Sequence, residues 1–214
     1  RAESVRIPTR CQNNSELLEV LAESAINSPK GESLCEEIIS RCIGILTKTE
    51  RQWRILNFMG SLCHCNGKGV RPIQWTIRRM LLEEASFVLP RLAVRSKAAG
   101  QGAAPVIVLS GDPKYFPAFG ETGEVELAEF YRRGGLEATR YLERYIVLCS
   151  QLCIGRNNEN APAVQALLPL DVVLAIVTSS SLAEEFPSLA ASLCEMLNEC
   201  FLDAEPHEPV ALSV

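Results

Sequence analysis

Aromatic side chains are scarce in this chain of 214 residues, at 6%. Sheet proteins fill their strands with aromatic and β-branched residues, so this scarcity argues against a β-sandwich. Hydrophobic residues make up 47% and charged residues 22%, proportions that exclude a disordered, collagen-like or coiled-coil chain. Because leucine, alanine and glutamate are abundant, we expect a predominantly helical protein of one large or two small domains.

The chain also lacks an excess of basic residues. It has 21 Lys and Arg against 26 Asp and Glu, which gives a net charge of −5. Nucleic-acid binding needs concentrated positive charge, so we expect no nucleic-acid partner. The sequence begins at Arg1 without a signal-peptide pattern. We expect a processed product or, preferably, a piece of a larger protein.

Long apolar runs are missing as well. The best candidate, residues 167–178, is short and is interrupted by Pro169 and Asp171. A helix that spans a membrane needs about 20 apolar residues, so we expect no direct membrane insertion.

Nine cysteines are present, and an odd number does not suit a disulfide framework. Reduced cysteine is a small, often buried hydrophobe, so cysteines in leucine-rich stripes predict core packing in a reducing compartment. Five cysteines follow a leucine directly, at Leu34-Cys35, Leu62-Cys63, Leu148-Cys149, Leu152-Cys153 and Leu193-Cys194.

Capping signals and apolar spacing predict the first helices. Ser33 with Glu36 forms a capping box for one helix, and Thr49 with Gln52 forms another for a helix that ends near Asn66-Gly67. An earlier helix is expected from Asn14 or Ser15 to residues 29–31, and a later one from Pro72. Further helices are expected over 124–153 with a break at Gly134-Gly135, over 163–168 and 172–177 on either side of Pro169, and over 187–202.

Residues 96–123 differ from the rest because they are rich in glycine and proline and show no periodicity. We interpret them as one long inserted loop, in which Val106–Leu109 is the only strand candidate and has no evident partner. The chain then divides into an N-terminal helical part (1–95), the loop (96–123) and a C-terminal helical part (124–214), with the helices forming one continuous domain. The expected fold class is all-α, as an armadillo-like solenoid or a bundle.

Cysteine and histidine spacing raises the question of a metal or a catalytic thiol. Zinc could use Cys63 and Cys65 with Cys149 and Cys153, but a C-x-C pair on a helix points its thiols about 200° apart. We therefore expect no structural zinc. Only two histidines occur, and His64 does not face its neighbour Cys63. We expect no enzyme, no catalytic residues, no cofactor and no metal.

Residues Asn66–Gly69 lack the phosphate-loop pattern, so we interpret them as an interhelical turn. Basic residues are densest between Lys68 and Arg95. A solvated face is the ordinary interpretation, and contact with a polyanion is the alternative. The residues concerned are Lys68, Arg71, Arg78, Arg79, Arg91 and Arg95.

Two segments resemble one family of channels. Residues 54–74, RILNFMGSLCHCNGKGVRPIQ, closely resemble the helix–turn–helix around LCVCNG-x-x-VR-x-NQ in ryanodine receptors, and inositol trisphosphate receptors carry a looser version. The second segment is similar to the one that the trisphosphate receptors write as YYRYQL…LDVDLIL…LPYDLRASFC…VDRDP. It runs from Glu124–Tyr131 through Arg156–Asn158, Leu170–Val173 and Phe186–Cys194 to Asp203–Pro206. Both occur in the family's order.

The chain is thus identified as similar to the helical, armadillo-like RIH region of inositol trisphosphate and ryanodine receptors. The resemblance implies a cytosolic piece of a tetrameric calcium-release channel, at the endoplasmic reticulum or a related store, that couples ligand binding to a distant pore. Its partners would be other domains and subunits of the channel. The family's inositol phosphate contacts precede the matched part, so we expect no inositol trisphosphate binding by this chain alone. The rival hypotheses are an independent armadillo-like adaptor and a zinc- or thiol-dependent enzyme.

Overall fold

The structure is a computed structural model that describes residues 28–48, 52–65, 67–95 and 106–202. Helices account for 70% of these residues, so the predicted helical character is confirmed. The predicted all-α class is wrong in one respect, because two small antiparallel sheets are also present. The helix expected from Asn14 or Ser15 lies outside the described residues.

Helix α2 (Pro29–Lys48) begins four residues before the predicted capping box at Ser33. The hydroxyl oxygen of Ser28 accepts a hydrogen bond from the backbone N–H of Gly31 at 3.1 Å, and Pro29 fills the first helical position. Proline suits that position because its fixed φ is already helical and no N–H is needed there. Residues 29–31 therefore start a helix, whereas the sequence analysis placed a helix end there.

Helix α3 (Trp53–Leu62) ends earlier than predicted, and a short hairpin follows it. Strand β1 (His64–Cys65) pairs with β2 (Lys68–Gly69), and Gly67 between them has a φ of 73°. An Asn-Gly pair between strands is a strong hairpin signal, since its turn needs positive φ. The expected interhelical turn at 66–69 is thus a hairpin. Helix α4 (Arg71–Ile77) then starts with Pro72 as predicted and continues into the π-helical segment η1 (Arg78–Glu84).

A three-stranded sheet borders the region predicted to be a loop and takes one strand from it. Strands β3 (Arg91–Arg95), β4 (Val106–Ser110) and β5 (Glu124–Glu126) are antiparallel in the order β3-β4-β5. Leu92 pairs with Leu109, so the predicted strand at 106–109 has partners on both sides. The short helices η2 (Ser86–Val88) and η3 (Pro117–Phe119) precede β3 and β5. Within residues 106–123, the regular elements are β4 and the short η3, and the other residues form turns and irregular backbone.

The C-terminal helices follow the predicted breaks. Helix α5 (Leu127–Arg133) gives way to α6 (Gly135–Cys153) at Gly134-Gly135, where Gly135 has a φ of 69°. Pro169 separates α7 (Ala161–Leu167) from α8 (Leu170–Val177), as predicted. Helix α9 (Ser180–Glu185), which Ser179 caps, was not predicted. Helix α10 (Pro187–Leu197) with its extension η4 (Asn198–Leu202) corresponds to the helix predicted over 187–202.

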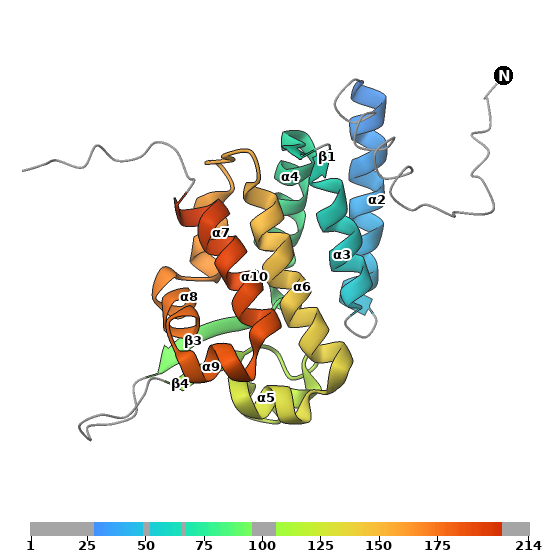
Figure 1. The fold of residues 1–214 in the computed structure, drawn as a ribbon. Coiled ribbons are helices and arrows are strands. Elements are labelled where there is room, and N and C mark those ends of the chain that lie inside the picture. Colours follow the sequence, from blue (N-terminus) through green and yellow to red (C-terminus); the bar gives the residue numbers. More distant parts are fainter. Residues whose placement is uncertain (1–27, 49–51, 66, 96–105, 203–214) are drawn as a thin grey trace, which may run out of the picture.

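The long helix α6 is central to the described part of the chain (Figure 1). It packs against α3 on one side and α10 on the other, while α2 contacts α3 and α4. The three-stranded sheet packs against α5 and α8. Helices arranged around a central one correspond to the bundle alternative, and an armadillo-like solenoid is not confirmed.

Most of the cysteines lie in the core, as predicted. Eight of the nine are described, and all eight are free thiols. Cys35, Cys63, Cys149 and Cys153 are buried, although Leu34 beside Cys35 is exposed. Burial raises the pKa of the Cys63 and Cys149 thiols, so both stay protonated. Cys194 is exposed, so its predicted burial is wrong: Leu193 faces the core, and the next helical position points about 100° away. None of the described helices combines the length and apolar composition needed to span a membrane.

Candidate functional site

The side chain of Gln74 joins α4 to the end of α6 and is completely buried. Its Nε2 donates to the backbone carbonyl oxygens of Gln151 at 2.9 Å and Ile154 at 3.1 Å. Its Oε1 accepts from Nδ2 of Asn157 at 2.8 Å. All three partners lie about 80 residues further along the chain, so one amide group ties together two distant segments.

These hydrogen bonds supply donors to backbone carbonyl groups at the C-terminus of α6. The last carbonyls of a helix have no partner within it and are costly when buried without one. Gln74 supplies donors to two of these carbonyls, and Nδ2 of Asn160 donates to a third, that of Leu152, at 2.8 Å. Asn157 and Asn160 are themselves buried. A buried hydrogen-bonded network of this kind favours one arrangement of the elements that it joins, although Oδ1 of Asn160 has no hydrogen-bond partner within the described part of the chain.

Two glycines near Gln74 lie in close contact with the end of α6. A Cβ on Gly69 would overlap the backbone carbonyl oxygen of Ile154, which cannot move without distorting the end of α6. A Cβ on Gly60 would overlap only the side-chain oxygen of Gln151, and a flexible side chain can rotate away. A side chain should therefore be tolerated less well at Gly69 than at Gly60. We call Gly69, Gln74, Gln151, Ile154 and Asn157 the amide junction.

The amide junction brings together the two segments that carry the family resemblance. Gly69 and Gln74 belong to the stretch 54–74, and Asn157 belongs to the Arg156–Asn158 motif. No role was predicted for Gln74 or Asn157 from the sequence. A buried glutamine next to proline in a short helix offers no local sign of its partners, because all of them are distant in sequence.

Comparison with protein families gives a match to the RIH domain model of ryanodine and inositol trisphosphate receptors (RYDR_ITPR) over residues 9–92. The predicted resemblance to this receptor family is confirmed. The matched segment contains the Gly69 and Gln74 side of the amide junction and ends within β3. The resemblance of the C-terminal part lies beyond it and stays a prediction. A search of curated proteins found no match.

The arginines of the predicted basic stretch are largely engaged by carboxylates. Arg78 pairs with Glu83 at 2.9 Å, and Arg79 pairs with Glu36 of α2 at 2.6 Å. The Arg79 guanidinium also lies 5.2 Å from the centre of the Trp75 ring. These pairs cancel charge locally and spread the basic groups over several elements. The arrangement favours a solvated face over a polyanion site.

The residues considered for zinc do not form a recognisable metal centre. Among residues 28–48, 52–65, 67–95 and 106–202, no group of three His, Cys, Asp or Glu is placed to hold an ion. The Cys63 thiol instead donates to the carbonyl oxygen of Met59 at 3.4 Å. The absence of structural zinc stays a prediction. His64 is half-buried at the hairpin, and His207 lies outside the described residues.

Proposed function

We propose that this chain is a helical piece of an inositol trisphosphate receptor-like calcium-release channel, in which it acts as a structural and allosteric coupling scaffold. The RIH match over residues 9–92 supports the channel family. The amide junction carries the proposal of coupling, because a buried contact with three hydrogen bonds should make α4 and the end of α6 move together. A scaffold that transmits a displacement needs such rigid contacts between its elements.

The proposal extends to the partners and the location of the full-length protein. The chain would contact other domains and subunits of a tetrameric channel, on the cytosolic face of the endoplasmic reticulum or a related calcium store. It would have no catalytic role. Trefoil domains before this piece and a six-helix pore after it are expected in the full-length protein, and their absence from the flanking sequence would contradict the proposal.

We test the channel role by expressing the full-length protein in cells that lack inositol trisphosphate and ryanodine receptors. Release of stored calcium on addition of inositol trisphosphate is expected from the wild type. Gln74→Leu should move the half-maximal ligand concentration upward by tenfold or more at equal protein level, whereas Gln52→Leu, at an exposed glutamine, should not. Release that is insensitive to Gln74→Leu would contradict coupling through the junction, and no release at all would contradict the channel role.

The chain alone should not bind inositol trisphosphate. A triply phosphorylated ligand needs several convergent cationic side chains, and Arg78, Arg79 and Arg95 are each paired with a carboxylate. Calorimetric titration of the isolated chain should give no saturable heat. Micromolar binding that Arg78→Ala and Arg79→Ala abolish would make this piece a ligand site.

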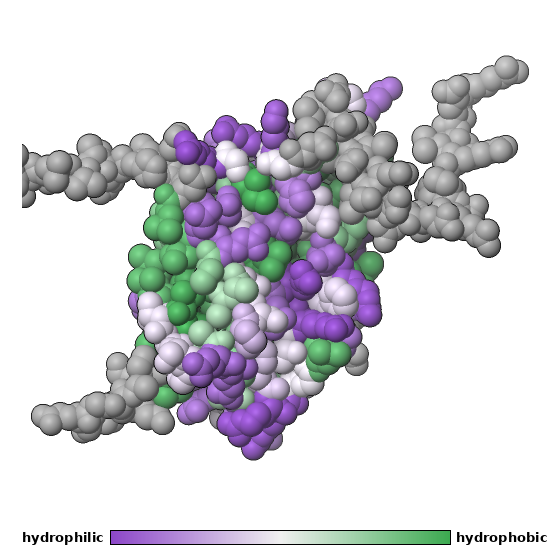
Figure 2. All heavy atoms as spheres, viewed as in Figure 1, coloured by the Kyte–Doolittle hydropathy of each residue, from purple (hydrophilic) through white to green (hydrophobic). Residues whose placement is uncertain are grey.

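One observation favours the alternative, an independent armadillo-like adaptor. Helix α8 exposes Leu170 and Leu174, at 41% and 39% of their surface, and Figure 2 shows hydrophobic residues gathered over this helix. Exposed apolar patches often mark a contact with another protein. Both roles can use this surface, so the sequence that flanks the chain and the calcium-release experiment discriminate between them.

A further inference from the structure

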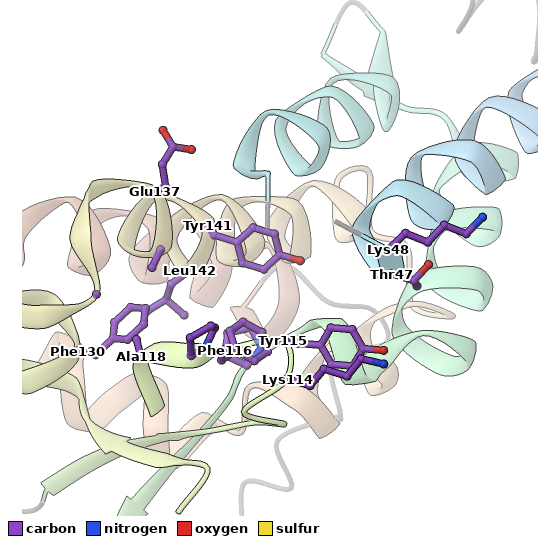
Figure 3. A pocket seen from close by; sticks show the side chains of 14 residues that line it. Thr47, Lys48, Lys114, Tyr115, Phe116, Ala118, Phe130, Glu137, Tyr141 and Leu142 are labelled. Atoms are coloured by element: carbon purple, nitrogen blue, oxygen red, sulfur yellow. The ribbon is translucent and has the colours of Figure 1, made fainter. Parts of the chain in front are cut away.

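A cavity of about 380 Å³ opens between the end of α2, the segment that connects β4 to β5, and the start of α6 (Figure 3). Its wall includes Phe116, Phe130, Tyr141 and Leu142, all of which are buried in the core. Small-molecule sites usually have 300–1,000 Å³ and a mainly apolar lining with a few polar groups. The cavity fits the lower end of that range, and it is separate from the amide junction.

The apolar wall is held in place by contacts of its own. The Phe116 ring stacks on Phe119 with centroids 4.9 Å apart, and Phe119 meets Phe130 edge-on at 5.8 Å. The hydroxyl of Tyr141 donates to the carbonyl oxygen of Val88 at 3.0 Å. The wall is therefore preformed, so a ligand would not have to order it.

The charged groups of the rim are distributed unevenly. Figure 3 places Lys48 and Lys114 toward one end of the cavity and Glu137 toward the other. Among the described residues, no carboxylate forms an ion pair with either lysine. The Lys114 ammonium lies 5.2 Å from the centre of the Tyr115 ring, over its face. As far as the described residues show, the two ammonium groups are thus available to an anion on exposed side chains, whereas the Glu137 carboxylate points away from the cavity in Figure 3.

We propose that this cavity binds a small amphipathic carboxylate, with its apolar chain along the aromatic wall and its carboxylate at Lys48 and Lys114. At about 30 Å³ for each non-hydrogen atom, the volume accommodates about a dozen such atoms, as in a medium-chain fatty acid. Burial of the chain supplies most of the affinity. The exposed lysines fix the orientation and select the sign of the head group.

The proposal is tested by calorimetric titration of the whole chain with decanoate and, separately, with decylammonium, which has the same chain and the opposite charge. Decanoate should bind at least tenfold more tightly. Equal affinity, tighter binding of decylammonium, or no saturable binding of decanoate would overturn the proposal.

Variants then locate the site. Lys48→Ala with Lys114→Ala should weaken decanoate binding about tenfold, whereas Lys30→Ala with Lys68→Ala removes the same charge from exposed positions outside the lining and should change nothing. Ala138→Trp, which fills the cavity, should abolish binding of decanoate, with its melting temperature measured to confirm folding. Because the lysine variants change only exposed side chains, they decide the question even if Ala138→Trp fails to fold. Unchanged decanoate affinity in the Lys48→Ala, Lys114→Ala variant would overturn the assignment.

A vesicle sedimentation experiment distinguishes binding of a free carboxylate from binding to a membrane surface. The cavity encloses a single chain, so the protein should stay in the supernatant when phosphatidylcholine vesicles with one tenth phosphatidylserine are sedimented. Co-sedimentation that Lys48→Ala with Lys114→Ala abolishes would show that the lysines serve a lipid surface, and would overturn the proposal of a small-molecule site.

Discussion

The amide junction and the three-stranded sheet both join residues far apart in the chain, but they use opposite chemistry. The junction buries a neutral amide with three hydrogen bonds and allows no side chain at Gly69. The sheet buries apolar side chains such as Leu92 and Leu109, and places the ion pair of Arg95 and Glu124 at its surface. Buried polar groups are costly when they lose a partner, whereas exposed charges return to water. The junction should therefore respond to substitution much more strongly than the polar groups of the sheet.

Replacement of Gln74 is the most severe test of this comparison. Gln74→Leu removes both donors to the end of α6 and the acceptor for Asn157, and leaves three buried polar groups without that partner. We expect the free energy of unfolding to fall by about 4 kcal/mol. Urea denaturation measures it, with Gln52→Leu as the exposed control. A loss of less than about 1 kcal/mol would mean that water replaces the amide and that the junction is not rigid.

The backbone contact at Gly69 should give the second largest effect. Gly69→Ala forces a methyl group against the carbonyl oxygen of Ile154, and we expect a loss of about 2 kcal/mol from overpacking. Gly44→Ala is the matched control, because an added Cβ there meets nothing within 4 Å and alanine favours the α2 helix by about 1 kcal/mol. Thermal melts should therefore move in opposite directions for the two variants. A shift in the same direction would contradict the close approach.

The elements predicted from the sequence were those whose chemistry is local. The break at Gly134-Gly135 and the division of α7 from α8 at Pro169 depend on residues at the break itself. Strand β3 was missed because its pairing with β4 is formed across ten or more intervening residues. The role of Gln74 was missed for the same reason, since its partners lie about 80 positions away. The start of α2 had a local signal in Ser28-Pro29, but Pro29 was interpreted as the end of an earlier helix and the start was placed at the capping box of Ser33. The β1–β2 hairpin also had a local signal in Gly67, which was interpreted as the end of the preceding helix.

Tyr141 is a test of intermediate size, on the side of α6 that faces the sheet region. Tyr141→Phe keeps the ring and removes only the hydroxyl that donates to the Val88 carbonyl. We expect a loss of about 1 kcal/mol in urea denaturation, the usual value of one buried hydrogen bond. Ser192→Ala, which removes an exposed hydroxyl that donates to the carbonyl oxygen of Ser188, is the control and should cost less. Equal losses would show that the Val88 contact contributes nothing particular.

The smallest effect is expected at the ion pair of Arg95 and Glu124, which joins β3 to β5. The two groups are 2.7 Å apart, yet their side chains are 61% and 43% exposed. Water solvates both charges when the pair is broken, and salt screens them when it is intact, so Arg95→Ala should cost about 0.5 kcal/mol. A double-mutant cycle with Glu124→Ala isolates the coupling between the two side chains from other effects of each substitution. The coupling energy should decrease further in 1 M salt. A coupling above about 2 kcal/mol that persists in salt would contradict the comparison, because the sheet would then depend on its polar contacts as strongly as the amide junction does.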